Sequence, residues 1–272
     1  MPLTLVPTPI GNLEDITLRA LRVLREADII ACEDTRTSSI FLQHYDIHRP
    51  LTSFHIHNEN DKLPSLLQKL REGANIAVIS DAGTPGISDP GWILLRRAID
   101  EGLPADVLPG PNAVIPAVLL SGLNPQPFMF MGFPPEKHGE RVRLFEGVKD
   151  FAGTLCFYVS PHKIARDIAD MLQVFGDRDS ALVREISKVY QETIRGTLND
   201  ILAKINDGVK GELVLVISGC NSEGINDSWK EEARSMYESG LSVKDIASSV
   251  SERFGVPKND IKKYILSESR LT

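Results

Sequence analysis

Acidic side chains follow two short apolar runs of this chain, at points where they could do chemistry. Glu33 and Asp34 come directly after one run, and Asp81 comes two residues after another. A carboxylate at such a position can accept hydrogen bonds from a hydroxyl or an amine, or take up a proton. Each also has a structural alternative. Asp81 would cap the following turn, while Glu33 and Asp34 would form an N-cap and an ion pair with Arg36.

Two imidazoles lie close together in the polar run 54–60. If that run is a strand, alternation places His55 and His57 on one face, as a pair of metal ligands requires. No third ligand has a suitable spacing. We therefore expect no metal, and surface histidines are the simpler interpretation.

Two loops rich in glycine and proline surround these side chains in the sequence. They span residues 8–12 and 80–91, and each connects an apolar run to a segment with helical spacing. Glycine lets the backbone approach a ligand closely, and proline fixes its path. Because open α/β sheets bind ligands at the carboxyl ends of parallel strands, we expect both loops, with Gly83 and Thr84, to line a small-molecule site.

The chain lacks the common motifs of catalysts that work without a cofactor. It contains no Gly-x-x-x-x-Gly-Lys-Ser/Thr, Gly-x-Gly-x-x-Gly, His-Glu-x-x-His or Gly-x-Ser-x-Gly motif. This absence favours chemistry in which a bound cofactor carries the reactivity and the protein positions it. Methyl transfer from S-adenosylmethionine is such a chemistry.

The first 122 residues alternate short apolar runs with helical spacing, which predicts βαβ units and a mainly parallel sheet. We expect Asp15 to cap the first helix, in which Thr17, Ala20, Leu21 and Leu24 share one face. The predicted strands are Leu3–Val6, Ile29–Cys32, Ile76–Ile79 and Ala105–Leu108. The later helices are predicted at 62–72, at 91–101 and up to Leu120.

Residues 122–127 contain two prolines and are the best linker candidate. Beyond them, strands are predicted at 128–131, 154–158, 181–183 and 213–217, and helices near 140–149, 162–175 and 198–206. Segments 180–187 and 189–196 would pair as a hairpin, so the second sheet should be mixed. We therefore expect an α/β domain at 1–122, a second at 127–220 and a helical extension at 227–272, in which two short helices form a helix–turn–helix-like pattern.

The composition bounds the class of protein. No apolar stretch approaches the length that spans a bilayer, and the N-terminus has no signal-peptide pattern. Cys32, Cys156 and Cys220 are too scattered for a disulfide framework or a zinc site, so we expect a cytoplasmic protein. The formal net charge of −7 means that positive charge for an RNA substrate must be local. Two regions are weak candidates, and for either one a solvated helix face is the simpler interpretation: Lys137–Arg143, and the tail with Lys258, Lys262, Lys263 and Arg270.

Motifs from the N-terminus to Ile217 resemble those of the small-subunit ribosomal RNA methyltransferases, a branch of the tetrapyrrole methylase superfamily. Ser80–Gly91 and Pro109–Pro111 resemble the superfamily as a whole, whereas Glu33–Arg36 together with Arg184–Gly196 are similar to this branch. The other matching segments are Val6–Leu13, His57–Glu59, Gly132-Phe133 with Pro135 and Lys137, and Tyr158 with Pro161-His162. The tail resembles the helical extension of the same branch.

The resemblance implies two α/β domains of tetrapyrrole-methylase type with a cofactor cleft between them, plus the small C-terminal helical extension. It implies S-adenosylmethionine as cofactor, a homodimer, and 2′-O-methylation of a cytidine ribose in 16S ribosomal RNA, free or in the small ribosomal subunit. Implied cofactor contacts are Pro9, Ile10, Asp81, Ala82, Gly83, Thr84, Pro85, Asn112, Ala113 and Tyr158. In the matching segments we expect substrate contacts at Gly11, Asn12, Arg36, Lys137, His162 and Arg184.

A ribose hydroxyl must lose its proton by the end of methyl transfer, so we expect a proton acceptor at the N-terminal strand ends. Glu33 and Asp34 are the first candidates, with His55 or Glu59 behind them. Lys188 is better suited to holding phosphate or stabilising the alkoxide, because an ammonium must lose its own proton before it can act as a base.

The sequence leaves two other functions open. A superfamily member that methylates a small molecule such as a tetrapyrrole fits the acidic charge, whereas the helical tail and the charged hairpin favour RNA. A non-catalytic RNA-binding module is the third possibility. Such a module needs no cofactor cleft, so the elaborate loops argue against it.

Overall fold

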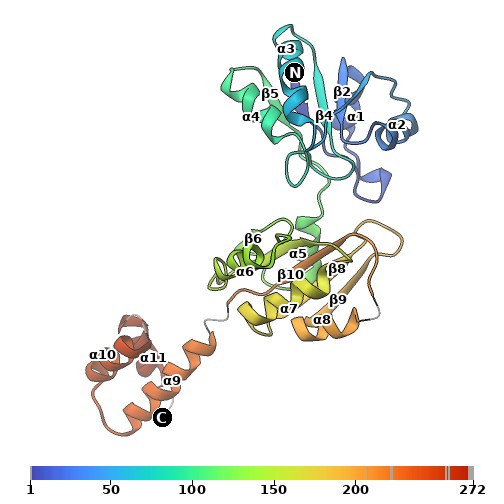
Figure 1. Ribbon diagram of the computed structural model, residues 1–272. Helices are drawn as coiled ribbons and strands as arrows, with labels where there is room; N and C mark the ends of the chain where they lie inside the picture. The colour runs from blue at the N-terminus through green and yellow to red at the C-terminus, as the bar shows by residue number, and fades with distance from the viewer. Residues whose placement is uncertain (1, 207, 221–222, 255, 257, 269–272) are drawn as a thin grey trace. The chain divides into compact units, whose positions relative to one another are not determined.

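The computed structural model describes residues 2–206, 208–220, 223–254, 256 and 258–268, and Figure 1 shows its ribbon. The chain divides into two compact units, Met1–Lys149 with Gly153–Ser218, and Asp150–Ala152 with Gly219–Thr272. Positions 255, 257 and 269–272 of the predicted extension lie outside the described residues.

Five parallel strands form the first sheet, in the order β3-β2-β4-β1-β5. The strands are β1 (Leu3–Leu5), β2 (Ile29–Cys32), β3 (Leu51–Ser53), β4 (Ile76–Ile79) and β5 (Ala105–Val107). They are connected by the 3₁₀ turn η1 (Leu13–Asp15) and by α1 (Leu18–Glu26), α2 (Thr35–His44), α3 (Glu59–Arg71) and α4 (Trp92–Asp100). Because the strands are parallel, all five end at the same edge of the sheet.

Helices cover both faces of this sheet, with α1 and α2 on one side and α3 and α4 on the other (Figure 1). Leu5 and Val78 pack with the helices α3 and α4, whereas Val6 and Ile79 pack with α1 and α2. Neighbouring strand residues face opposite ways, so a strand buried on both faces needs an unbroken apolar run. Ile76–Ile79 is such a run, which is why the sequence predicted β4 correctly.

The second sheet is mixed, as predicted, with the strand order β6-β7-β10-β8-β9. Its strands are β6 (Phe128–Phe130), β7 (Thr154–Val159), β8 (Asp179–Arg184), β9 (Glu192–Thr197) and β10 (Leu213–Ile217). Only β6 and β7 are parallel, and β8 and β9 form the predicted antiparallel hairpin. The surrounding helices are α5 (Val114–Ser121), α6 (His138–Glu146), α7 (Ile164–Phe175) and α8 (Leu198–Lys204).

The two faces of the second sheet have different partners. Cys156 and Tyr158 of β7 pack in the cluster that contains α5. Phe157, which alternates with them, faces the other way and meets Phe145 of α6, with ring centroids 5.7 Å apart. Ile10 of the first glycine-rich loop also packs in the α5 cluster, so this loop contacts the α5 face of the second sheet.

Three helices form the core of the second unit: α9 (Glu223–Glu238), α10 (Val243–Phe254) and α11 (Lys258–Glu268). Trp229, Ile246, Val250 and Ile261 are buried in one apolar cluster of their own. Helices α10 and α11 correspond to the predicted helix–turn–helix-like pair, whereas α9 was not predicted. In the part of the chain that the structure describes, no helix is both long and apolar enough to cross a membrane.

Several local predictions are wrong. Asp15 ends the 3₁₀ turn η1, and the cap of α1 is Thr17, whose hydroxyl accepts the N–H of Ala20 at 3.0 Å. Helix α2 and the short strand β3 were not predicted. Helix α2 buries only Ser38 and Leu42, and β3 consists of three half-buried residues. Neither element therefore shows a strong hydrophobic periodicity in the sequence.

Candidate active site

The carboxyl ends of β2 and β4 lie side by side because these strands are neighbours in the parallel sheet. The N–H of Asp34 donates to Oδ1 of Asp81 over 3.4 Å, and the N–H of Asp81 donates to the carboxylate of Glu33. Burial, and then the charge of Asp81, raise the pKa of Glu33 above its ordinary value. The structure thus brings these three predicted site residues together.

Asp34 has the capping role that the sequence left open. Its carboxylate accepts the N–H of Arg36 at 2.8 Å at the start of α2, and it pairs with the Arg36 guanidinium at 3.0 Å. The hydrogen bonds from Arg36 lower the pKa of Asp34. A carboxylate with a lowered pKa is a weaker proton acceptor, so Glu33 is the better candidate of the two.

His55 and His57 lie in the turn between β3 and α3, so the assumption that they alternate on a strand is wrong. Their ring centroids are 6.0 Å apart. Oδ1 of Asn58 accepts the N–H of His55 at 2.8 Å and turns the chain, and Glu59 begins α3. Within the described residues, no group of three or more His, Cys, Asp or Glu could hold a metal ion.

The two glycine-rich loops are joined to each other. Thr8 and Gly83 exchange two backbone hydrogen bonds of 2.9 Å, and the hydroxyl of Thr84 donates to the carbonyl of Pro111 over 3.2 Å. Gly83 has φ 78°. A Cβ atom there would lie 3.5 Å from Cγ2 of Ile10 and 3.9 Å from the Pro111 carbonyl. Glycine therefore keeps the space between these two residues open.

Three predicted cofactor residues, Ile10, Ala113 and Tyr158, pack in one apolar cluster on the α5 face of the second sheet. The ring of Tyr158 lies 4.8 Å from that of Phe130. Burial raises the pKa of Tyr158 to about 12, so its phenol stays neutral and can donate a hydrogen bond. Asn112 has a local role, because its Oδ1 accepts the N–H of Ile115 at 3.0 Å in the first turn of α5. The other predicted cofactor residues of the two loops are Pro9, Ala82 and Pro85.

Residues 186–188 pack against the first glycine-rich loop. A Cβ atom on Gly11 would collide with Cγ of Lys188 and lie 2.9 Å from the carbonyl of Ile186. The ammonium of Lys188 pairs with Glu185 at 2.9 Å and with Glu212 at 3.3 Å. Burial alone would lower the pKa of Lys188, but these two carboxylates outweigh it and raise the pKa. Lys188 therefore stays charged, which suits charge stabilisation and not proton removal.

The remaining predicted substrate residues are spread over several elements. Oδ1 of Asn12 accepts the N–H of Glu14 at 3.0 Å and caps η1, and His162 is exposed. Lys137 pairs with Glu140 at 3.0 Å, and Arg184 pairs with Glu192 at 3.0 Å across the β8–β9 hairpin. Arg36 pairs with Asp34 and is otherwise exposed. None of these contacts by itself assigns a substrate role.

Arg141 corrects the expectation of a solvated basic face at 137–143, because it is only 1% exposed. Its Nε donates to the carboxylate of Asp170 over 2.7 Å. Its Nη1 donates to the carbonyls of Pro135 and Glu136, both over 2.9 Å. Arg141 thus anchors the segment that precedes Lys137, a role that charge counting along the sequence could not reveal.

Asp89 is a further candidate site residue that the sequence did not single out. It belongs to the same loop as Asp81, so the signal was available in the second aspartate of the glycine- and proline-rich segment. Burial raises its pKa to about 7, together with the charges of Glu33 and Asp81. A carboxyl with a strongly perturbed pKa marks a candidate functional site.

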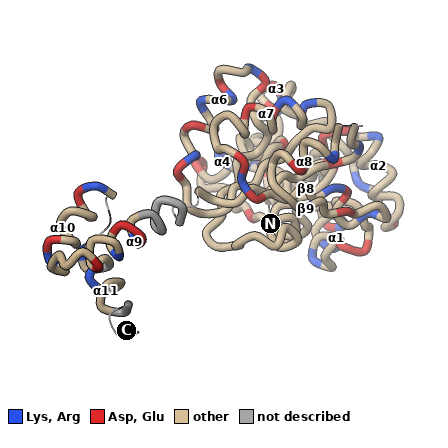
Figure 2. The backbone as a smooth tube through the Cα atoms, turned by 90° about the horizontal axis from the view of Figure 1, so that it is seen from below, with Lys and Arg blue, Asp and Glu red and all other residues tan. Residues whose placement is uncertain are grey.

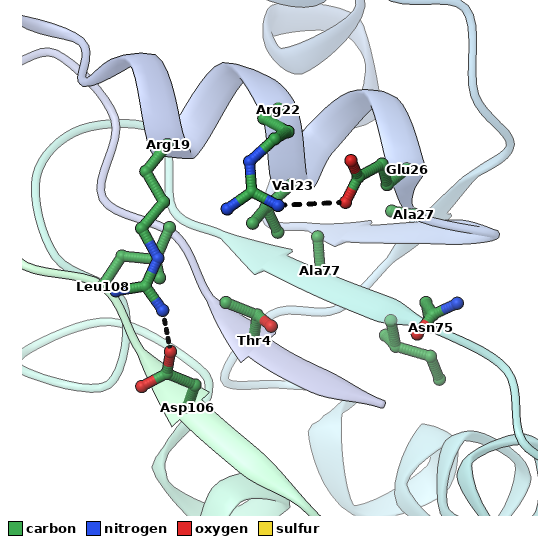
Figure 3. Close-up of a pocket in the computed structure, with 11 residues that line it drawn as sticks. Thr4, Arg19, Arg22, Val23, Glu26, Ala27, Asn75, Ala77, Asp106 and Leu108 are labelled. Carbon is green, nitrogen blue, oxygen red and sulfur yellow. Dashed lines mark hydrogen bonds and ion pairs between the residues drawn. The ribbon is translucent and has the colours of Figure 1, made fainter. Parts of the chain in front are cut away.

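Figure 3 shows a separate pocket along α1. An ion pair between Arg19 and Asp106 spans it, and Arg22 pairs with Glu26 at 3.5 Å. None of the residues that line it is a predicted site residue. It lies beside the start of β4, at Asn75 and Ile76, whereas the candidate site follows the end of that strand.

Comparison with known proteins gives the class of this chain. The family model described as "Tetrapyrrole (Corrin/Porphyrin) Methylases" matches residues 2–202. The chain therefore belongs to the tetrapyrrole methylase family.

Its curated relatives include three proteins named "Ribosomal RNA small subunit methyltransferase I". The one from Streptococcus pyogenes serotype M1 is 44% identical over 222 residues, which cover 81% of this chain and 77% of the relative. The one from Halalkalibacterium halodurans is 41% identical and covers 95% of this chain and 92% of the relative. The one from Haemophilus influenzae is also 41% identical and covers 97% and 96%.

Solved structures with the same fold include the following two. The crystal structure of diphthine synthase has a TM-score of 0.66 and 14% identity, covering 80% of this chain and 90% of its own. The uroporphyrin-III-C-methyltransferase from Thermus thermophilus has a TM-score of 0.57 and 21% identity, covering 82% of this chain and 97% of its own. At these identities the likeness shows the fold, which is the predicted one: two α/β parts of tetrapyrrole-methylase type and a C-terminal helical part.

S-adenosylmethionine is the cofactor of this methylase family, and the residues present fit it. Ile10, Ala113 and Tyr158 form an apolar surface that can contact the base and the aliphatic chain. The left-handed Gly83 leaves space beside Ile10 that a side chain would fill. The exposed carboxylate of Asp81 can accept hydrogen bonds from hydroxyl or ammonium groups.

Proposed function

We propose that this chain transfers a methyl group from S-adenosylmethionine to the 2′-oxygen of a cytidine ribose in 16S ribosomal RNA. The observation that carries the proposal is its similarity, over nearly the whole chain, to proteins named ribosomal RNA small subunit methyltransferase I. The family domain ends at residue 202. The similarity to these relatives covers 95–97% of the chain and so extends into the C-terminal helical unit.

The arrangement of the site supports methyl transfer to a hydroxyl group. The cofactor supplies an activated methyl group, so the protein must orient the acceptor oxygen and receive its proton. Glu33, whose pKa is raised, lies at the end of β2 in a cluster of carboxyl groups, and a carboxylate of this cluster can serve the second task. The charged Lys188, which packs on Gly11, can hold a phosphate or stabilise the developing alkoxide.

Transfer to isolated small ribosomal subunits tests the function. Subunits that lack the modification are incubated with the protein and S-adenosylmethionine carrying a labelled methyl group, and the RNA is digested to nucleosides. Mass spectrometry should find the label in 2′-O-methylcytidine. Asp81→Asn, which removes a proposed cofactor contact, should transfer far less, whereas Asp100→Asn at the far end of α4 should match the wild type.

Other outcomes would change the proposal in defined ways. A label on the cytosine base, or on another nucleoside, would contradict the 2′-oxygen or the cytidine. No label in RNA, with transfer to a tetrapyrrole acceptor assayed in parallel, would favour the small-molecule alternative. A comparison of free 16S RNA with the assembled subunit identifies which of the two is the partner.

We also propose that the chain acts as a homodimer. Lys and Arg are interspersed with Asp and Glu along the described chain (Figure 2), and the net charge is −7. An acidic chain that binds RNA needs a focused positive surface, and a site built from two copies can supply one. Light scattering at micromolar concentration should report twice the mass of the 30.0 kDa chain. A monomer would count against this arrangement.

A further inference from the structure

Asp89 lies in the loop between β4 and α4, in a turn closed by a backbone hydrogen bond. The N–H of Gly86 donates to the carbonyl of Pro90 over 3.1 Å and closes the loop around it. Ser88 has φ 65°, an uncommon conformation for a residue with a side chain. A Cβ atom on Gly132, which follows β6, would lie 3.7 Å from the hydroxyl of Ser88. The residue before Asp89 therefore lies next to the end of β6 in the second sheet.

Titratable groups from both sheets act on Asp89. Glu33 at the end of β2 and Asp81 in the same loop disfavour its charged form, in addition to its burial. On the second sheet, burial and the charge of Asp89 both contribute to the raised pKa of Tyr158. No described residue donates a hydrogen bond to the Asp89 carboxylate, which is only half-buried. Its oxygen atoms are therefore free to meet a ligand or a substrate.

Three carboxylates held this close favour either a proton or a cation among them. The cofactor brings a methyl group on a positively charged sulfonium. A positive charge beside the cluster lowers the proton affinity of Asp89, and removal of that charge raises it again. The proton affinity of Asp89 is therefore lowest while the methyl group is still on the cofactor and highest once it has moved.

We propose that the carboxylate of Asp89 accepts the proton of the methylated hydroxyl group, an inference that rests on the proposed function. The O–H bond of the acceptor breaks as its oxygen forms the new bond to the methyl carbon. The carbon–sulfur bond breaks and its electron pair stays on sulfur. The proton moves to a carboxylate oxygen of Asp89 and later to water. One positive charge disappears at sulfur and one proton appears on the cluster, so the net charge of the site does not change.

Among the described residues, the carboxylates of Asp34 and Glu33 have hydrogen-bond partners, unlike that of Asp89. Asp34 is held by Arg36, and Glu33 accepts the N–H of Asp81. A general base works best when its pKa lies near the working pH, and that of Asp89 is raised to about 7. Glu33 and Asp81 then act as positioning residues that set the proton affinity of Asp89.

Proton release on cofactor binding tests this idea without any RNA. Calorimetric titrations at pH 7 in buffers with different ionisation enthalpies count the protons released. Wild type should release a measurable fraction of one proton per S-adenosylmethionine bound, because the raised pKa leaves Asp89 partly protonated beforehand. S-adenosylhomocysteine, which lacks the positive charge, should release far less. Asp89→Asn should abolish the release, and Asp100→Asn should leave it unchanged.

A second variant keeps the test open if asparagine at position 89 prevents folding. Glu33→Gln removes one of the charges that raise the pKa of Asp89, so proton release should shift to lower pH. Wild type that binds S-adenosylmethionine without releasing a proton would overturn the inference. So would an Asp89→Asn protein that releases as much as wild type.

Single-turnover kinetics on ribosomal subunits complete the test. Asp89→Asn should slow methyl transfer by roughly 10²–10⁴-fold with cofactor affinity within a few-fold of wild type, and the rise of the rate with pH should disappear. A wild-type rate in this variant would refute a proton acceptor at Asp89. Failure of the proposed function is distinguishable, because it would appear as a wrong acceptor for wild type while the proton-release result is unaffected.

Discussion

At the scale of single residues, similar carboxyl groups acquire different proton affinities from their neighbours. Asp34 pairs with Arg36, and its pKa is lowered. Glu33 and Asp89 are partly buried beside other acids, and their pKa values are raised. All three follow the ends of the adjacent strands β2 and β4. Whether the neighbouring group is a guanidinium or another carboxylate therefore decides which of them can take a proton near neutral pH.

The raised pKa of Asp89 makes folding stability depend on pH. The folded state holds this proton more tightly than the unfolded state, so the contribution is fully present below the ordinary pKa of 3.8 and is lost as pH rises through about 7. Asp89→Asn removes this loss. Relative to wild type, its free energy of unfolding should improve between pH 4.5 and pH 8 by on the order of 1 kcal/mol, after allowing for solvent screening. Urea denaturation at both pH values measures this, and a difference independent of pH would contradict it.

Glu33 and Asp34 should respond differently to loss of charge. Glu33→Gln changes the acidic cluster and should reduce turnover strongly with cofactor affinity nearly unchanged. Asp34→Asn keeps a good N-cap for α2 and should reduce turnover less. Turnover and calorimetry of both variants on ribosomal subunits give the comparison. If both turn over at the wild-type rate, neither Glu33 nor Asp34 takes part in the reaction.

At the scale of elements, the loops after β1 and β4 form one candidate site because they bind each other, and Gly83 leaves space beside Ile10. Gly83 and Thr8 are paired by two hydrogen bonds, and Gly83 has a left-handed backbone. A bulky replacement there would strain the fold as well as fill the site. The smallest replacement, alanine, therefore separates the two effects best.

Gly83→Ala should weaken binding of S-adenosylmethionine, because its Cβ enters the space between Ile10 and Pro111. Gly73→Ala is the matched control, since Gly73 also has a left-handed backbone, φ 92°, but nothing lies within 4 Å of the added atom. Both variants should lose about 1–2 kcal/mol of stability from backbone strain. Only the first should lose cofactor affinity in calorimetry. Equal affinities of the two folded variants would refute a cofactor site at Gly83.

The same loops show what the sequence could and could not predict. Unbroken apolar runs such as Ile76–Ile79 predicted the buried strands, and glycine and proline marked the loops after them. The order of the strands in the sheet could not be predicted from the sequence. The pairing of β2 with β4, which brings Glu33 close to Asp89, was therefore not predicted either. The burial of Arg141 and the contact of Lys188 with Gly11 also depend on packing between distant segments, which periodicity does not encode.

At the scale of the whole molecule, the chain combines a methylase unit with a small helical unit. The family model ends at residue 202, and the two solved structures of the same fold cover 80% and 82% of this chain. The helical unit has an apolar core of its own, in which Trp229, Ile246 and Ile261 are buried. The cofactor residues all belong to the first unit. We therefore expect the two units to have separate tasks, with cofactor binding in the first and engagement of the large substrate in the second.

A chain that ends at Cys220 tests this division of tasks. Every proposed cofactor residue is retained, so the affinity for S-adenosylmethionine should stay within a few-fold of the full chain. Methyl transfer to small ribosomal subunits should fall at least about tenfold, which corresponds to about 1.4 kcal/mol of lost interaction. Raising the subunit concentration should recover part of the rate if the helical unit contributes affinity for the substrate. Circular dichroism of the shortened chain, with cofactor binding as the functional control, shows whether the methylase unit is folded. A folded, cofactor-binding protein that methylates subunits at the rate of the full chain would show that the helical unit has no part in substrate recognition.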